Sequence, residues 1–305
     1  MTDADTPAPD TPDPDTPHPD TTDPNKPGKD KPSKLPEGAH TDFTDDMTYG
    51  DYLQLDTILS AQRPVSDKHD EQLFIIIHQT TELWMKLALH EMHAAIDAIT
   101  AGNLRAAFKM LARIGRIQSQ LIQSWDVLST LTPADYLTFR DALGHSSGFQ
   151  SLQYRQIEFL FGNKNRAMLE PHRDRPEDYK TLETTLNSPT LYDVVLRLLA
   201  EKGLPVPEEV LRRDVTERYT GHPGVTEMWL GVYRDTDKHW QEYELAEELV
   251  DLEDWFQQWR FRHVTTVERI IGNKRGTGGT AGVAYLQKAL EIRFFPELWE
   301  VRTVL

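Results

Sequence analysis

The stretch FQQWRFRHVTTVERIIG, residues 256–272, contains the pattern that decides the fold class. Its apolar residues recur every three or four positions, which is the period of one face of an α-helix. With one residue added on the N-terminal side, that face reads Leu252, Phe256, Trp259, His263, Val267, Ile270. His263 therefore stands where a core side chain is expected. Because burying an unpaired polar ring costs on the order of a few kcal/mol, this histidine needs a partner.

A second histidine has a similar setting in FIIIHQTTELW, residues 74–84. Phe74 and Met85 share the helical face of His78. Two such histidines indicate a group between the helices that binds nitrogen, and a haem is the candidate in a helical protein without cysteine. Periodicity alone leaves open that both are core histidines with ordinary hydrogen-bond partners.

Composition excludes several classes of protein. The formal net charge is −16, and no basic patch is visible, so we expect no binding to nucleic acid. No apolar run reaches the roughly 18 residues of a membrane helix, and the N-terminus has no apolar signal segment. The absence of cysteine excludes disulfides and thiolate ligands. We expect a cytoplasmic protein without a membrane segment.

The chain divides at about residue 38. Ten of the nineteen prolines lie within residues 1–38, among many acidic residues, so this part is predicted to be a disordered acidic tail. Residues 39–305 are predicted to form a single all-α domain. We expect a helical bundle with additional helices and a haem held between long helices. The predicted helices cover residues 47–61, 70–102, 104–131, 133–144, 151–161, 189–203, a short piece after 204, 225–271 with a break near 235–237, and 283–290. Residues 162–188 are predicted to be irregular.

Three other metal or nucleotide motifs are rejected, one on its spacing and two on their structural context. His90 and His93 are three residues apart, whereas the zinc motif HExxH places its histidines four apart. The Glu-x-x-His spacing of di-iron bundles occurs only at Glu37 and His40, in a stretch rich in Pro and Gly. Residues 276–281, GTGGTA, match the dinucleotide fingerprint in letters but follow a predicted helix instead of a strand.

Two further features suit an anionic ligand. Tyr136 and Arg140 are four residues apart on one helix, which places a phenol beside a guanidinium that can bind a carboxylate. The glycine-rich run that contains Lys274, Arg275 and Thr277 can close over an anionic group. Spacing alone leaves two alternatives open. Arg140 can be a surface arginine beside a half-buried tyrosine, and the glycine-rich run can be a plain linker between helices.

Five stretches occur in an order that resembles a known family. They are YGDYLQLD (49–56), FIIIHQTTELWMK (74–86), LTPADYLTFRDALGHSSGFQSLQYRQIEFLFGNKN (131–165), WRFRH (259–263) and KRGTGGTAGVAYL (274–286). Together they resemble tryptophan 2,3-dioxygenase. The resemblance runs from about residue 35 to residue 305 and leaves out the acidic tail.

The resemblance assigns a role to each matching residue. It implies one b-type haem per subunit with its iron axially ligated by His263, and a catalytic distal His78 that hydrogen-bonds the indole N–H. The segment that holds the indole is implied to be Phe74, Ile75, Ile76, Ile77 and His78. The amino-acid end of the substrate would be held by Tyr136, Arg140 and Thr277. Trp125 and Ser147 match positions of the haem pocket, and Tyr49, Tyr52 and Leu53 match residues contributed by the neighbouring subunit.

The resemblance also implies the reaction. The enzyme would insert O2 across the indole C2–C3 bond of L-tryptophan to give N-formyl-L-kynurenine, the first step of tryptophan catabolism by the kynurenine pathway. It would work as a homotetramer, a dimer of dimers. Two alternatives remain at this point: a b-type haem protein for electron transfer with both histidines as ligands, and a helical scaffold without haem.

Overall fold

The computed structural model describes residues 34–305. The first 33 residues of the predicted acidic tail lie outside the described residues. By contacts the chain forms two compact units, one up to Ser60 and one from Ala61 to Leu305. The single domain predicted over residues 39–305 stays a prediction.

The first unit contains two short helices, α1 (Tyr49–Leu53) and α2 (Leu55–Leu59). The sequence predicted one helix here, which is wrong because Gln54 between them has a left-handed backbone with φ of 53°. Thr48 begins α1 with a capping box, since its hydroxyl accepts the Asp51 N–H and the Asp51 carboxylate accepts the Thr48 N–H. Tyr49 and Tyr52 on α1 are each 74% exposed.

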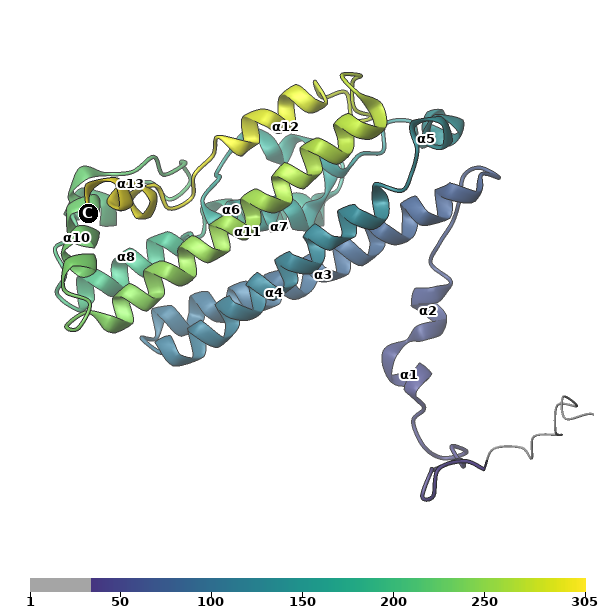
Figure 1. The fold of residues 1–305 in the computed structure, drawn as a ribbon, viewed down its shortest axis with the longest axis horizontal. Coiled ribbons are helices and arrows are strands. Elements are labelled where there is room, and N and C mark those ends of the chain that lie inside the picture. The colour runs from purple at the N-terminus through teal and green to yellow at the C-terminus, as the bar shows by residue number, and fades with distance from the viewer. Residues whose placement is uncertain (1–33) are drawn as a thin grey trace, which may run out of the picture. The chain divides into compact units, whose positions relative to one another are not determined.

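Three long helices form the body of the second unit: α3 (His69–Thr100), α4 (Leu104–Leu128) and α11 (Trp240–Ile271). A short turn joins α3 to α4, and α4 packs against both α3 and α11 (Figure 1). Their inward faces are fully buried and include Ala95, Ile99, Leu111, Ile114, Leu245 and Leu249. These three helices carry both histidines singled out by the sequence.

The shorter helices cover this body. They are α5 (Pro133–Phe139), α6 (Leu152–Phe161), α7 (Pro176–Asn187), α8 (Leu191–Glu201), α9 (Glu208–Leu211), α10 (Pro223–Arg234), α12 (Val283–Leu290) and α13 (Pro296–Val304), with 3-10 turns η1 (Arg140–Leu143), η2 (Gly148–Gln150) and η3 (Arg166–His172). The predicted break before α11 is confirmed, because residues 235–239 separate it from α10. Residues 34–305 contain no strand, so the all-α class is confirmed. No helix in that range is long and apolar enough to cross a membrane.

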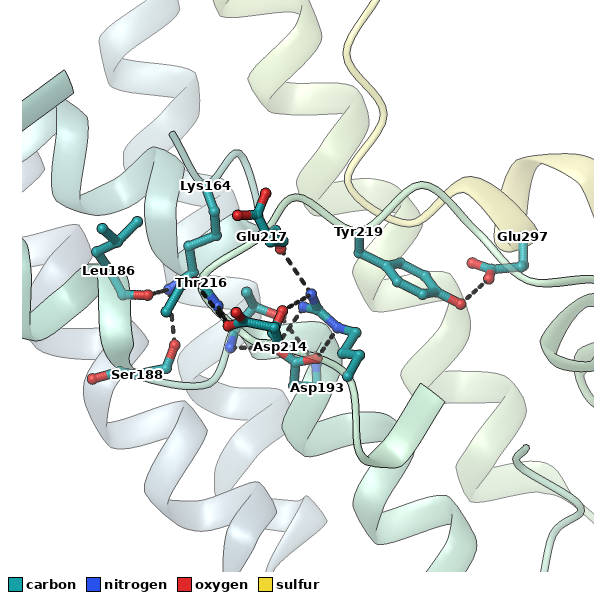
Figure 2. Close-up of polar contacts among 11 residues, drawn as sticks. Lys164, Leu186, Ser188, Asp193, Asp214, Thr216, Glu217, Tyr219 and Glu297 are labelled. Carbon is teal, nitrogen blue, oxygen red and sulfur yellow. Dashed lines mark hydrogen bonds and ion pairs between the residues drawn. The ribbon is translucent and has the colours of Figure 1, made fainter. Parts of the chain in front are cut away.

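The prediction that residues 162–188 are irregular is wrong, because α7 lies there. Leu182 and Leu186, four residues apart, are fully buried on its inner face. The Lys164 ammonium donates to the carbonyl oxygens of Thr185 (2.7 Å), Leu186 (2.9 Å) and Ser188 (2.8 Å), at the C-terminal end of α7 (Figure 2). A cation that binds otherwise unpaired carbonyl groups stabilises the end of a helix. The sequence of α7 itself does not predict this contact with Lys164.

Two buried carboxylates nearby are paired as well. Asp193 accepts two hydrogen bonds of 2.8 Å from the Arg213 guanidinium, and Glu297 accepts the Tyr219 hydroxyl proton (Figure 2). Glu297 opens the chain's last helix, α13, which the sequence analysis did not predict although Pro296 stands at its first position. The first pair joins the segment after α9 to α8, and the second joins the same segment to α13.

Candidate functional site

His78 lies half-buried in the N-terminal part of α3. Its ring Nδ1 is 2.7 Å from the carbonyl oxygen of Phe74, one turn earlier on the same helix. Because a carbonyl oxygen only accepts, Nδ1 carries the proton and Nε2 keeps its lone pair. Burial lowers the pKa of His78 below its usual 6.5, and the Phe74 carbonyl and the Glu82 charge oppose that shift. The ring is therefore a neutral acceptor.

His263 lies half-buried on α11. The Trp125 indole stacks on its ring, with centroids 4.7 Å apart and planes at 13°. Burial, helped by the nearby His78, lowers the pKa of His263 to about 4. No group in residues 34–305 hydrogen-bonds with this ring, so it offers a neutral nitrogen without a partner. On the predicted inward face around it, Leu252, Phe256, Trp259 and Ile270 are buried.

An aromatic cluster lies beside the two histidines. The Phe74 ring is 4.2 Å from the His78 ring and 5.8 Å from both Tyr136 and Phe139, between centroids. Ile75 and Ile77 are half-buried, whereas Ile76 is 40% exposed. The structure thus brings three of the predicted site residues, Phe74, His78 and Tyr136, together.

Two buried indole N–H groups have no partner: Nε1 of Trp125 and Nε1 of Trp259. Unpaired buried donors are rare in folded proteins and indicate a group that the protein alone does not supply. Together with the unpartnered His263 nitrogen, they fit a haem bound through one neutral histidine. No group of three or more His, Asp and Glu residues that could hold a metal ion occurs within the described part of the chain.

Arg140 connects the helices to the glycine-rich loop, residues 272–282. Its Nη2 donates to the carbonyl oxygen of Arg275 at 2.6 Å, while its buried Nε has no partner. Burial raises the pKa of the adjoining Tyr136 hydroxyl, and the Arg140 charge opposes this. A cation with a free N–H next to a neutral phenol is a suitable receptor for a carboxylate.

The glycine-rich loop also rests on the segment that precedes α6. Thr277 donates its hydroxyl proton to the Ser146 carbonyl oxygen at 2.5 Å. A Cβ at Gly278 would lie 2.8 Å from the Cβ of Ser147, so only glycine allows this approach. Thr277 and Ser147, two of the predicted residues, therefore belong to one contact region.

Sequence reasoning missed one residue near this region, Glu82. Its carboxylate binds Ser151 and Gln153, which are 69 and 71 residues away along the chain. The only local signal is that Glu82 stands four residues after His78 on the same helix face. Tyr49, Tyr52 and Leu53 lie on α1 in the first unit, where the two tyrosines are exposed and Leu53 is half-buried.

Comparison with known proteins shows the family of the chain. The sequence profile of the family described as tryptophan 2,3-dioxygenase matches residues 35–305. The chain belongs to the tryptophan 2,3-dioxygenase family. The match covers α1 and α2 as well as the whole helical body, and only the acidic N-terminal residues lie outside it.

Individual members of the tryptophan 2,3-dioxygenase family are similar over nearly their whole length. The tryptophan 2,3-dioxygenase of Bacillus cereus is 56% identical over 271 residues, which cover 89% of this chain and 97% of the relative. The protein of the same name from Bradyrhizobium diazoefficiens is 59% identical, with 88% and 96% covered. That of Cupriavidus necator is 58% identical, with 87% and 90% covered.

Proposed function

We propose that this chain is a haem-dependent dioxygenase that converts L-tryptophan and O2 to N-formyl-L-kynurenine, the first step of tryptophan catabolism by the kynurenine pathway. Membership of the tryptophan 2,3-dioxygenase family implies these two substrates and a haem cofactor. The single observation that carries the assignment to this site is the pair of neutral histidines, His78 and His263, with aromatic side chains beside them.

His263 would be the axial ligand of one b-type haem in each subunit. A neutral, unpartnered imidazole nitrogen is what iron ligation needs, and the low pKa keeps protons from competing for it. Trp125 and Ser147 would border the macrocycle. When bound, a ferrous haem with one histidine ligand supplies the activation of O2.

His78 would orient the substrate. Its Nε2 lone pair can accept the indole N–H, since its Nδ1 proton is held by the Phe74 carbonyl. Phe74, Ile75, Ile76 and Ile77 belong to the same helical segment and would hold the indole. Because the ring has one acceptor and stays neutral, it positions the indole and need not remove a proton.

The amino-acid end of tryptophan would bind at the other side of the cluster. The Arg140 guanidinium has a buried N–H without a partner and would bind the carboxylate, with the Tyr136 hydroxyl as a second donor. Thr277 would contact the same end of the substrate from the glycine-rich loop. These contacts would select a free amino acid over a bare indole.

We further propose a homotetramer, a dimer of dimers, in which Tyr49, Tyr52 and Leu53 complete the site of the neighbouring subunit. Two observations support association with further copies. Tyr49 and Tyr52 are exposed, and α3 exposes a row of apolar residues, Leu83 (50%), Trp84 (36%) and Leu87 (37%). Exposed apolar rows on a helix favour an interface. A cytoplasmic location stays part of the proposal.

An electron carrier with both histidines on iron is the alternative. It gives no role to Arg140, Thr277 and the glycine-rich loop, and the three relatives named above are all tryptophan 2,3-dioxygenases. The family membership favours the dioxygenase over it.

The direct test starts from haem-loaded protein reduced without oxygen. L-tryptophan and air are then added, and absorbance is followed at the N-formylkynurenine band. We expect a steady rise that depends on both substrates. A flat trace from haem-loaded tetramer contradicts the proposed function.

The ligand assignment predicts that His263→Ala abolishes the Soret band of the purified protein. The matched control is His90→Ala, because His90 is an exposed histidine on α3 outside the site. We expect the control to bind haem like the unchanged protein. Normal haem content in His263→Ala would show that another residue binds the iron.

A further inference from the structure

Glu82 lies one turn after His78 on α3 and faces the N-terminal end of α6. Its Oε1 accepts the Ser151 hydroxyl proton at 2.6 Å, and its Oε2 accepts the Gln153 side-chain N–H at 2.8 Å. The same Gln153 nitrogen donates to the Glu82 backbone carbonyl at 2.7 Å. Three hydrogen bonds thus join one residue of α3 to the first residues of α6.

Of the two residues that Glu82 holds, Gln153 lies in the first turn of α6, and Ser151 ends a segment without α-helix, residues 144–151. Ser151 is the N-cap of α6, where its hydroxyl accepts the Tyr154 N–H at 3.1 Å. Within the same segment, the Ser146 carbonyl accepts the Thr277 hydroxyl and Ser147 contacts Gly278. Glu82 is therefore connected to the glycine-rich loop through a single short segment.

The glycine-rich loop has few other supports. From Asn273 to Ala281 no residue is buried, so no apolar side chain anchors this part in the core. Its described contacts to the rest of the site are the Arg140 bond to the Arg275 carbonyl, the Thr277 bond to Ser146 and the packing of Gly278 on Ser147. Two of these three end on the segment held by Glu82.

We propose that Glu82 is a positioning residue for the substrate. By holding Ser151 and Gln153 it fixes residues 144–151, and thereby the place of Thr277 relative to His78 and Arg140. The proposal rests on the proposed function, because it assigns the loop to tryptophan binding. Glu82 is not among the residues proposed to contact substrate or haem, so it would act through Ser151 and Gln153.

The decisive comparison is between Glu82→Ala and Glu82→Gln. Alanine removes both acceptors, so we expect KM for L-tryptophan to rise roughly tenfold, the change expected from losing about one charge-assisted hydrogen bond, with kcat within about threefold. Glutamine can accept from Gln153 and donate to the Ser151 oxygen, so it should restore KM to within about threefold. If glutamine is as harmful as alanine, the charge matters and the positioning role is wrong.

Hydrogen–deuterium exchange of the haem-loaded protein gives a readout that does not depend on activity. In Glu82→Ala, peptides covering residues 144–151 and 272–282 should exchange faster, while α4 and α8 keep their protection. Unchanged exchange in both segments overturns the proposal. If the unchanged protein makes no N-formylkynurenine, the proposed function fails, and the exchange result still decides whether Glu82 holds the loop.

The matched control is Glu91→Ala. Glu91 is a buried carboxylate on the same helix, paired with Arg113 of α4 at 2.6 Å and outside the site. We expect this variant to lose stability but to keep KM and the exchange rate of residues 272–282. An equal rise of KM in the control would show that general loss of stability raises KM, and not the loss of the hydrogen bonds from Glu82 to Ser151 and Gln153. That result would overturn the proposal.

Discussion

At the scale of single residues, the protonation of His78 is determined by one contact. The Phe74 carbonyl oxygen accepts a hydrogen bond from the Nδ1–H, with the two heavy atoms 2.7 Å apart, and leaves Nε2 as the only acceptor of the ring. Burial lowers the pKa of His78, so the neutral form is maintained at and above pH 6.5. Protonation would put an N–H on both nitrogens and remove the acceptor that we propose for the indole N–H.

This protonation state predicts the pH profile of kcat/KM. We expect no fall between pH 6.5 and about 8, and a decline only below pH 6.5, because the His78 pKa is lowered from that value. His78→Ala should keep its haem, lose roughly tenfold in kcat/KM, as expected for one lost hydrogen bond, and lack the acid limb. An inflection above pH 6.5 that disappears in His78→Ala would contradict a lowered pKa.

At the scale of elements, the sequence predicts helices that carry a repeating apolar pattern and misses those that depend on a single contact with another segment. The long helices α3, α4 and α11 carry apolar stripes over many turns, and Thr132 begins α5 with its hydroxyl accepting the Asp135 N–H, as expected. Helix α7 has few apolar residues, and the carbonyl oxygens at its C-terminal end bind Lys164, which lies before the helix and outside it. The site follows the same rule, because Glu82 meets its partners only across about 70 residues of chain.

The close contact between two loops predicts the effect of Gly278→Ala. The added Cβ would lie 2.8 Å from the Ser147 Cβ, so the glycine-rich loop must shift. We expect KM for L-tryptophan to rise roughly tenfold, with little change in Tm because the loop contributes no buried side chain between Asn273 and Ala281.

Gly231→Ala on α10 is the matched control, because its Cβ would meet nothing within 4 Å. Its KM should stay unchanged, and its Tm should stay equal or rise, since alanine is favoured over glycine inside a helix. A normal KM in Gly278→Ala would argue against a role of the loop in substrate binding.

At the scale of the whole molecule, the chain consists of two compact units, and the residues with proposed roles are distributed over both. Every proposed residue of the haem and tryptophan site in the subunit itself lies after Ala61, whereas Tyr49, Tyr52 and Leu53 lie before it. If a neighbouring copy supplies the latter, the second unit alone is an incomplete enzyme.

Deletion of residues 1–60 tests this division. We expect the shortened protein to fold, bind haem with a normal Soret band and lose at least about tenfold in kcat/KM, because its site lacks the neighbour's side chains. Deletion of residues 2–33, which lie outside the family match, should leave kcat/KM unchanged. Full activity in the larger deletion, measured on monomeric protein in gel filtration, would contradict a shared site.

The bond between the His78 ring and the Phe74 carbonyl has a mechanical consequence. Donor and acceptor belong to one turn of a rod of 32 residues, so this wall of the site is stiff. The glycine-rich loop, by contrast, has no buried residue between Asn273 and Ala281 and is held by Arg140, Ser146 and Ser147. In the proposed enzyme, an arriving amino acid would displace this loop and leave the helix in place, and the rate of loop movement would limit how quickly the product leaves.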